Sequence, residues 1–265
     1  MTRALVGGLI NAGYDPKTIR ASDPFPNARE QIASLGIHAS DNNAEIVKKA
    51  DVIVLAVKPQ VLTEVIADLA DSLAADTLVL SIAAGIPIAT IERALGAEAE
   101  SSPIRPVVRC MPNTPALLGS GITGMYANPG VTAEQKLLAE QVASAAGQWV
   151  WLDNEVDIDA VTAVSGSGPA YFFYLMEAMI EAGTELGLSS ELAAKLTVAT
   201  ATGAAAMAEQ PGADPAVLRQ NVTSPGGTTE RALKLFDEGQ LNPKIRTALA
   251  GAAHRSAELA REFGQ

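Results

Sequence analysis

The sequence is poor in the residues that cross-link chains or bind metals. It has one cysteine, Cys110, and two histidines, His38 and His254, in 265 residues. An internal disulfide is therefore excluded, and no Cys/His spacing indicates a metal site. The apolar neighbours of Cys110 favour a buried small side chain over a nucleophile. This composition is typical of a reducing compartment, so we expect a cytoplasmic protein without a bound metal.

Positive charge and long apolar runs are also scarce. Lysine and arginine number 19 against 30 acidic residues, which gives a net charge of −11. A nucleic-acid partner is not expected, because binding to the phosphate backbone needs a basic face. Charged residues and proline interrupt the most apolar windows, so neither a signal peptide nor a membrane span is expected. The 48% hydrophobic content suffices for one large or two smaller folded domains.

The first part of the chain alternates between strand and helix patterns. The continuous apolar runs at 52–57 and 77–82 are typical of parallel strands that are buried on both faces. Helical patterns separate these and several shorter strand patterns, and the capping box Thr132 to Gln135 begins one of the helices. The alternation predicts an α/β fold with a doubly wound, Rossmann-like dinucleotide-binding domain.

The start of this domain is unusual. A Rossmann domain begins with a strand, then a Gly-rich phosphate-binding turn, then a helix. Here the helical pattern at 3–12 comes at once. We therefore expect an N-terminally truncated domain without its first strand and phosphate loop. A start site assigned too far downstream is the simplest explanation, and a truly shortened protein is the alternative.

Strand patterns vanish in the last part of the chain. We place the boundary at 153, so that 1–153 form the NAD(P)-binding domain and 154–265 an all-α domain. The Ala-rich helical pattern at 191–210 lacks a broad polar face. Packing against a partner subunit buries such a helix most easily, which predicts a homo-oligomer built on a helical-domain dimer. A central helix in a monomeric bundle is the other interpretation.

A short polar stretch at 221–230 contains the residues best suited to bind an anion. Pro225, Gly226 and Gly227 lead into a helical pattern that begins with two threonines. The first N–H groups of a helix lack backbone acceptors, and the helix dipole favours negative charge there. A substrate carboxylate would fit this site. A plain turn between two helix caps explains the same residues equally well.

Four segments together resemble the pyrroline-5-carboxylate reductase family, in the order in which that family has them. They are Ala56-Val57-Lys58-Pro59, Met111-Pro112-Asn113-Thr114-Pro115, Ser165-Gly166-Ser167-Gly168-Pro169 and Thr223-Ser224-Pro225-Gly226-Gly227-Thr228-Thr229. Each motif alone is weak, but four in register across essentially the whole chain are strong. The resemblance implies reduction of 1-pyrroline-5-carboxylate to L-proline, the last step of proline biosynthesis.

The resemblance also assigns residues to the site. It implies cofactor contacts from Ser22, Asn43, Ala56, Val57, Lys58, Pro59, Ala83, Ala84, Gly85 and Asn221. It implies that the N–H groups of Gly226, Gly227 and Thr228 bind the substrate carboxylate. Thr229 is the catalytic candidate: its hydroxyl would orient the ring nitrogen, because a Thr hydroxyl is a poor acid.

Two questions stay open. An acidic residue such as Asp23 favours the ribose diol of NADH, whereas a hydroxyl such as that of Ser22, or an arginine, favours the phosphate of NADPH. No arginine is adjacent, so these residues by themselves leave the preference open. The family resemblance implies NADPH, with NADH as an alternative. A 3-hydroxyacid dehydrogenase-like enzyme using Lys195, and an inactive or weakly active dimeric Rossmann-type protein lacking its phosphate loop, are the competing functions.

Overall fold

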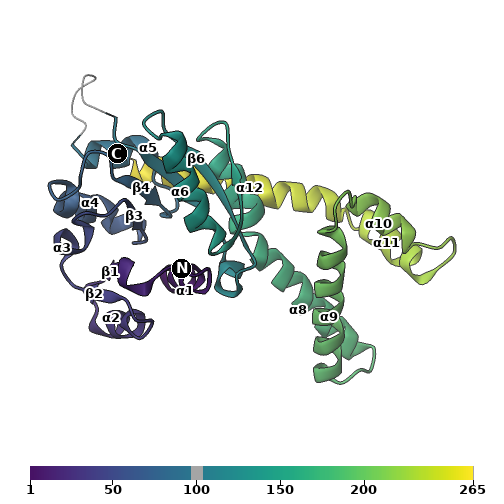
Figure 1. The fold of residues 1–265 in the computed structure, drawn as a ribbon. Coiled ribbons are helices and arrows are strands. Elements are labelled where there is room, and N and C mark those ends of the chain that lie inside the picture. The colour runs from purple at the N-terminus through teal and green to yellow at the C-terminus, as the bar shows by residue number, and fades with distance from the viewer. Residues whose placement is uncertain (97–103, 265) are drawn as a thin grey trace. The chain divides into compact units, whose positions relative to one another are not determined.

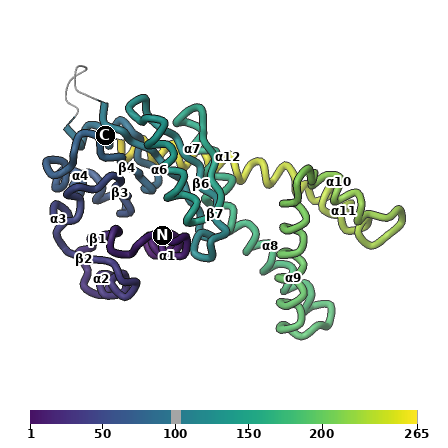
Figure 2. Tube along the Cα trace, viewed as in Figure 1, coloured from purple at the N-terminus to yellow at the C-terminus, as the bar shows by residue number. Residues whose placement is uncertain are grey.

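The computed structural model describes residues 1–96 and 104–264 and divides into two units (Figures 1 and 2). The first comprises Met1–Ser167 and Ala252–Gln265, and the second comprises Gly168–Gly251. In the described residues, the first unit combines strands with helices and the second is helical. The expected order, an α/β dinucleotide-binding fold followed by helices, is confirmed.

The first unit is built on a sheet in the order β3-β4-β5-β6-β7. Its strands are β3 (Val52–Leu55), β4 (Leu78–Ser81), β5 (Val107–Met111), β6 (Gly121–Ala127) and β7 (Gly147–Trp151). Neighbours are parallel except β5 and β6, which are antiparallel. A separate parallel pair joins β1 (Arg20–Ser22) to β2 (His38–Ser40). The sequence pattern does not predict β6, because two glycines interrupt its apolar run.

Helices cover both faces of the five-stranded sheet. Those of this unit are α1 (Thr2–Asn11), α2 (Pro26–Ala33), α3 (Asn43–Val47), α4 (Leu62–Ala70), α5 (Ile88–Ala94), α6 (Ala133–Ser144) and α7 (Asp157–Val161). Side chains alternate between faces along β4 and β5. Val79 and Val107 pack in a core with α4 and α5, and Leu80, Val108 and Cys110 pack in another with α6. The capping box that begins α6 is confirmed.

The second unit exposes many apolar side chains. Its helices are α8 (Gly168–Glu185), α9 (Ser190–Ala208), α10 (Pro215–Asn221), α11 (Thr228–Glu238) and the first part of α12 (Leu241–Phe263), up to Gly251. Helices α8 and α9 lie side by side (Figure 2). The consecutive residues Phe172, Phe173 and Tyr174 are 58–74% exposed. A soluble monomer rarely exposes so much contiguous apolar surface. No described helix has the length and apolar character needed to cross a bilayer.

Helix α1 approaches the end of α6 at Gly8. A Cβ atom on Gly8 would overlap the backbone carbonyl group of Ala145, the residue that caps α6. At the neighbouring Gly7, nothing lies within 4 Å of such an atom. Glycine is therefore required at position 8 and not at position 7.

We expect Gly8→Ala to lower the free energy of unfolding by about 1–3 kcal/mol, because overpacking forces the backbone apart. Gly7→Ala is the matched control and should raise it by about 0.5–1 kcal/mol, since alanine is the better helix former. Urea denaturation at a fixed protein concentration measures both. Equal effects at the two positions would show that the α1–α6 contact is not tight.

A partly buried ion pair joins three segments of the first unit. Arg109 of β5 donates from Nη1 to Glu155 Oε1 at 3.0 Å, and the backbone N–H of Ile88 donates to the same oxygen at 2.8 Å. Ile88 begins α5, and Glu155 lies between β7 and α7. Arg109 is buried, and its Nη2 atom has no hydrogen-bond partner among the described residues. The pair therefore connects the sheet to the start of α5 and to the segment after β7.

We expect Glu155→Leu to cost about 3–5 kcal/mol of unfolding free energy, because it leaves a buried guanidinium without a counter-charge. The double variant Arg109→Met, Glu155→Leu should recover at least half of this loss, since it removes the stranded charge as well. Denaturant unfolding of both single variants and the double variant completes the cycle. Additive losses would mean that the two side chains act independently.

Candidate active site

The first group of predicted cofactor residues lies at the carboxyl end of β1. Ser22 ends this strand, and its hydroxyl donates to Asn43 Oδ1 at 2.5 Å. Asn43, in the first turn of α3, donates from Nδ2 to Asp68 Oδ2 of α4 at 3.0 Å. The structure therefore brings Ser22 and Asn43 together and connects them to α4.

The second group lies at the carboxyl ends of β3 and β4. These strands are parallel neighbours with Leu55 opposite Ser81, and the N–H of Ile82 donates to the carbonyl oxygen of Leu55 at 3.1 Å. Parallel pairing therefore places the segment Ala56-Val57-Lys58-Pro59 beside Ala83-Ala84-Gly85. Open α/β sheets bind ligands at this edge.

Gly85 is required by both its backbone angle and its neighbours. Its φ is +72°, in the region that favours glycine. A Cβ atom would lie 3.0 Å from the Cβ of Leu259, which is in the last turns of α12. These turns fold with the first unit, where the Ser256 hydroxyl donates to Asp159 Oδ1 at 2.6 Å. The β4–α5 turn is thus packed from one side by α12 and held at its end by Glu155.

The residues of the first unit fit a nicotinamide dinucleotide. After β4, Ala84 is exposed whereas Ala83 and Gly85 are buried, so a flat ring can approach this small-residue segment closely at Ala84. Beside another strand end, the Ser22 hydroxyl donates to Asn43 and the Asn43 amide donates to Asp68. The Ser22 hydroxyl oxygen can still accept a hydrogen bond from a ribose hydroxyl. In the described part of the chain, no cluster of three or more His, Cys, Asp or Glu could hold a metal.

The predicted substrate residues lie in the second unit, at the start of α11. Gly226 has φ +72°, and its N–H donates to Glu230 Oε2 at 2.8 Å. The N–H of Gly227 donates to the Ser224 carbonyl oxygen at 3.0 Å. Thr228 and Thr229 follow in the first turn of the helix, where backbone N–H groups have no intrahelical acceptor. Asn221 ends α10 in the same unit.

The carboxylate of Glu230 makes a contact of the kind predicted for the substrate. It accepts a hydrogen bond from a glycine N–H at the N-terminus of a helix, where the dipole favours an anion. The Gly227 N–H is used inside the turn. The amides that can receive an external carboxylate are therefore those of Gly226, once Glu230 moves away, and of the first helical turn.

The Met111-Pro112-Asn113-Thr114-Pro115 loop has a clear structural role. Asn113 donates from Nδ2 to the carbonyl oxygen of Ser165 at 3.2 Å, and its Oδ1 accepts from the N–H of Ile122 at 2.9 Å. Both ends of its amide are therefore used to connect this loop to β6 and to the π-helical turn Thr162–Gly166 that precedes α8.

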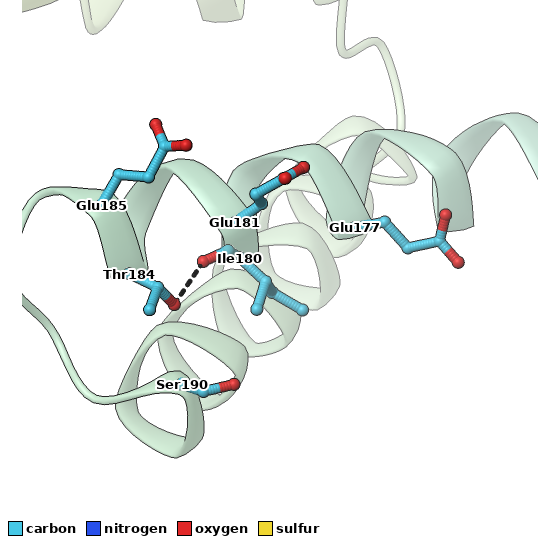
Figure 3. Close-up of a pocket in the computed structure, with 6 residues that line it drawn as sticks. All are labelled: Glu177, Ile180, Glu181, Thr184, Glu185 and Ser190. Atoms are coloured by element: carbon cyan, nitrogen blue, oxygen red, sulfur yellow. Dashed lines mark hydrogen bonds between the residues drawn. The ribbon is translucent and has the colours of Figure 1, made fainter.

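A groove on α8 is unsuited to the predicted ligands. Figure 3 shows Glu177, Glu181 and Glu185 along this groove, with Ser190 of α9 on its other side. In the described residues, none of the three carboxylates forms an ion pair. Three neighbouring negative charges repel both a carboxylate substrate and a phosphorylated cofactor.

The sequence alone did not identify three charged residues near the site. No arginine adjoins Ser22 and Asp23 in the sequence, but α2 carries Arg29 back to this turn, where its Nη1 donates to the carbonyl oxygen of Asp23 at 2.8 Å. The other two are Arg109, which lies inside the apolar run of β5, and Glu155, which follows β7. A charge within an apolar strand was the available signal for Arg109.

Comparison with known proteins identifies the family. A family model described as pyrroline-5-carboxylate reductase dimerisation matches residues 155–259, and one described as coenzyme F420-dependent NADP oxidoreductase matches residues 1–85. The pyrroline-5-carboxylate reductase of Pseudomonas aeruginosa is 52% identical over 266 residues, which cover 100% of this chain and 95% of that protein.

Solved structures agree. The pyrroline-5-carboxylate reductase of Coxiella burnetii superposes with a TM-score of 0.91 at 41% identity, covering 98% of this chain and 94% of that one. The Plasmodium falciparum enzyme, solved with NADP bound, gives a TM-score of 0.84 at 28% identity, covering 97% and 93%. The chain therefore belongs to the pyrroline-5-carboxylate reductase family.

Proposed function

We propose that this chain catalyses the NADPH-dependent reduction of 1-pyrroline-5-carboxylate to L-proline, the last step of proline biosynthesis, with NADH as an alternative donor. The end-to-end similarity to the Pseudomonas reductase carries the proposal. The small-residue edge of the sheet and the anion-binding start of α11 fit it. The 3-hydroxyacid dehydrogenase and inactive-protein alternatives are not favoured, because curated relatives from bacteria, archaea and plants are all reductases of this family.

In this proposal the first unit holds the cofactor. Ser22 and Asn43 contact its adenosine end, and the segments Ala56-Val57-Lys58-Pro59 and Ala83-Ala84-Gly85 line its path along the sheet edge. Asn221, which ends α10 in the second unit, is the further cofactor residue that the family resemblance implies. When bound, NADPH supplies the hydride for the imine carbon. The protein's contribution is to orient the reactants and exclude water, without a covalent nucleophile.

The start of α11 binds the substrate carboxylate in this proposal. The N–H groups of Gly226 and Thr228 donate to it after Glu230 has moved away, which exchanges one carboxylate for another. Gly227 contributes by its lack of a side chain, because a Cβ atom there would lie 2.9 Å from the Ser224 carbonyl oxygen. The Thr229 hydroxyl hydrogen-bonds the ring nitrogen and fixes the orientation of the C=N bond.

The enzyme acts as a homo-oligomer built on its helical unit. The match of residues 155–259 to the dimerisation model and the exposed aromatic residues of α8 support this assembly. We assign the protein to the cytoplasm, because its single cysteine is buried and no disulfide can form within the chain.

An assay of NADPH oxidation that depends on added 1-pyrroline-5-carboxylate tests the function. We expect a fall in absorbance at the reduced-nicotinamide band with stoichiometric formation of proline. The matched control omits the imine, and a second control replaces it with a 3-hydroxyacid and the oxidised cofactor. Turnover of the hydroxyacid without turnover of the imine would overturn the proposal.

Thr229→Ala tests the catalytic assignment. We expect the turnover number to fall about tenfold to a hundredfold, the effect of one lost orienting hydrogen bond, whereas the Kd for NADPH stays unchanged. Thr229→Ser keeps the hydroxyl and should retain most of the turnover. Full activity of the alanine variant would remove Thr229 from the mechanism.

A further inference from the structure

The turn after β1 carries a positive charge that the sequence does not reveal. Arg29 lies in the first turns of α2, and its Nη1 donates to the carbonyl oxygens of Asp23 and Pro24 at 2.8 and 2.9 Å. These two residues directly follow Ser22. The side chain of Arg29 is 23% exposed, so the guanidinium is anchored on the turn and still reaches solvent.

The free donors of this guanidinium are available to a ligand. Its recorded hydrogen bonds with the described residues use Nη1, and an arginine has N–H groups on Nη2 and Nε as well. Nη2 lies 3.6 Å from Asp41 Oδ2, which is too far for a hydrogen bond. Asp41 is 70% exposed, and an exposed ion pair of this kind contributes little energy. An incoming dianion can therefore replace Asp41.

The neighbouring side chains are already engaged. The Ser22 hydroxyl uses its single proton on Asn43 Oδ1. Asp23, which in sequence suggested a preference for the ribose diol of NADH, accepts at Oδ1 from the N–H of Phe25 at 2.8 Å. This hydrogen bond makes Asp23 a capping residue of its own turn. A positive group at this strand end therefore has to come from Arg29.

We propose that Arg29 determines the preference for NADPH over NADH, by binding the 2′-phosphate of the adenosine ribose with its Nη2 and Nε donors. The inference rests on the proposed function only in requiring a nicotinamide dinucleotide. A planar guanidinium suits a phosphate because two N–H groups can meet two oxygens at once. In a Rossmann fold, an arginine near the carboxyl end of the strand that follows the first helix can accept this phosphate. In this chain that strand is β1.

Asp41 opposes the phosphate in the same arrangement. It follows β2 as Asp23 follows β1, and the pairing of Ser22 with Ser40 brings both carboxylates to one edge. Its negative charge competes with the phosphate for Arg29. The NADPH preference is therefore set by a balance between one cation and one exposed anion, and either residue can be changed separately.

Binding measurements test this inference without turnover. The fluorescence of NADPH and of NADH is titrated with the full chain and with Arg29→Ala. We expect the Kd for NADPH to rise about 10- to 100-fold, the effect of losing a charge-assisted hydrogen bond, and the Kd for NADH to stay nearly constant. Adenosine 2′,5′-bisphosphate should compete with NADPH in the wild type and lose this advantage over 5′-AMP in the variant.

Arg20→Ala is the matched control. Arg20 begins β1, the strand that Ser22 ends. Like Arg29 it donates to a backbone carbonyl oxygen, that of Lys48 at 3.1 Å, but it lies at the end of β1 opposite to Ser22. It should leave both Kd values unchanged. Asp41→Asn leaves the turn intact and should tighten NADPH binding about two- to fivefold by removing a competing charge.

Equal weakening of NADPH and NADH in Arg29→Ala would show that Arg29 only supports the turn, and would overturn the inference. An unchanged ratio of the two Kd values would overturn it as well. If the chain binds NADPH and shows the Arg29 effect but does not reduce the imine, the inference stands and the proposed function fails. The two results are therefore separable.

Discussion

The Arg109–Glu155 ion pair is the interaction on which the geometry of the candidate active site depends. One carboxylate oxygen receives both the guanidinium of β5 and the first N–H of α5. The start of α5 cannot move without disturbing the sheet, and the segment after β7 is bound to both. One guanidinium nitrogen remains buried without a partner in the described residues, which costs stability. The pair therefore positions the β4–α5 turn more than it stabilises the fold.

This positioning matters because the turn has few other means of keeping its shape. Only the small methyl group of Ala83 packs in the core, Ala84 is exposed, and Gly85 occupies a backbone conformation that other residues avoid. Leu259 of α12 closes one side of the turn, and Glu155 holds its exit. A turn of small residues lets a flat ring approach it closely. Because such a turn has few side-chain contacts of its own, its rigidity depends on Leu259 and Glu155, which are remote in sequence.

The protein carries a net charge of −11, yet the proposed function requires it to bind two anions. It does so with local groups whose effect outweighs the overall field at short range. In our proposals, backbone amides at the start of α11 bind one anion and the anchored guanidinium of Arg29 binds the other. In each place a protein carboxylate, Glu230 or Asp41, lies against the donor. Ligand binding therefore replaces one anion with another.

The sequence by itself determined the alternation of buried strands and helices, the capping box of α6, and the four motifs that indicate the family. These features depend on residue periodicity and short spacings, which a linear pattern records. It did not reveal β6, whose glycines hide its pattern. Only the tertiary structure decided three contacts. Arg29 donates to the turn that follows Ser22, Glu155 pairs with Arg109, and Leu259 packs on Gly85. Each of these contacts joins residues whose proximity is created by helix direction and strand pairing, and no local pattern encodes it.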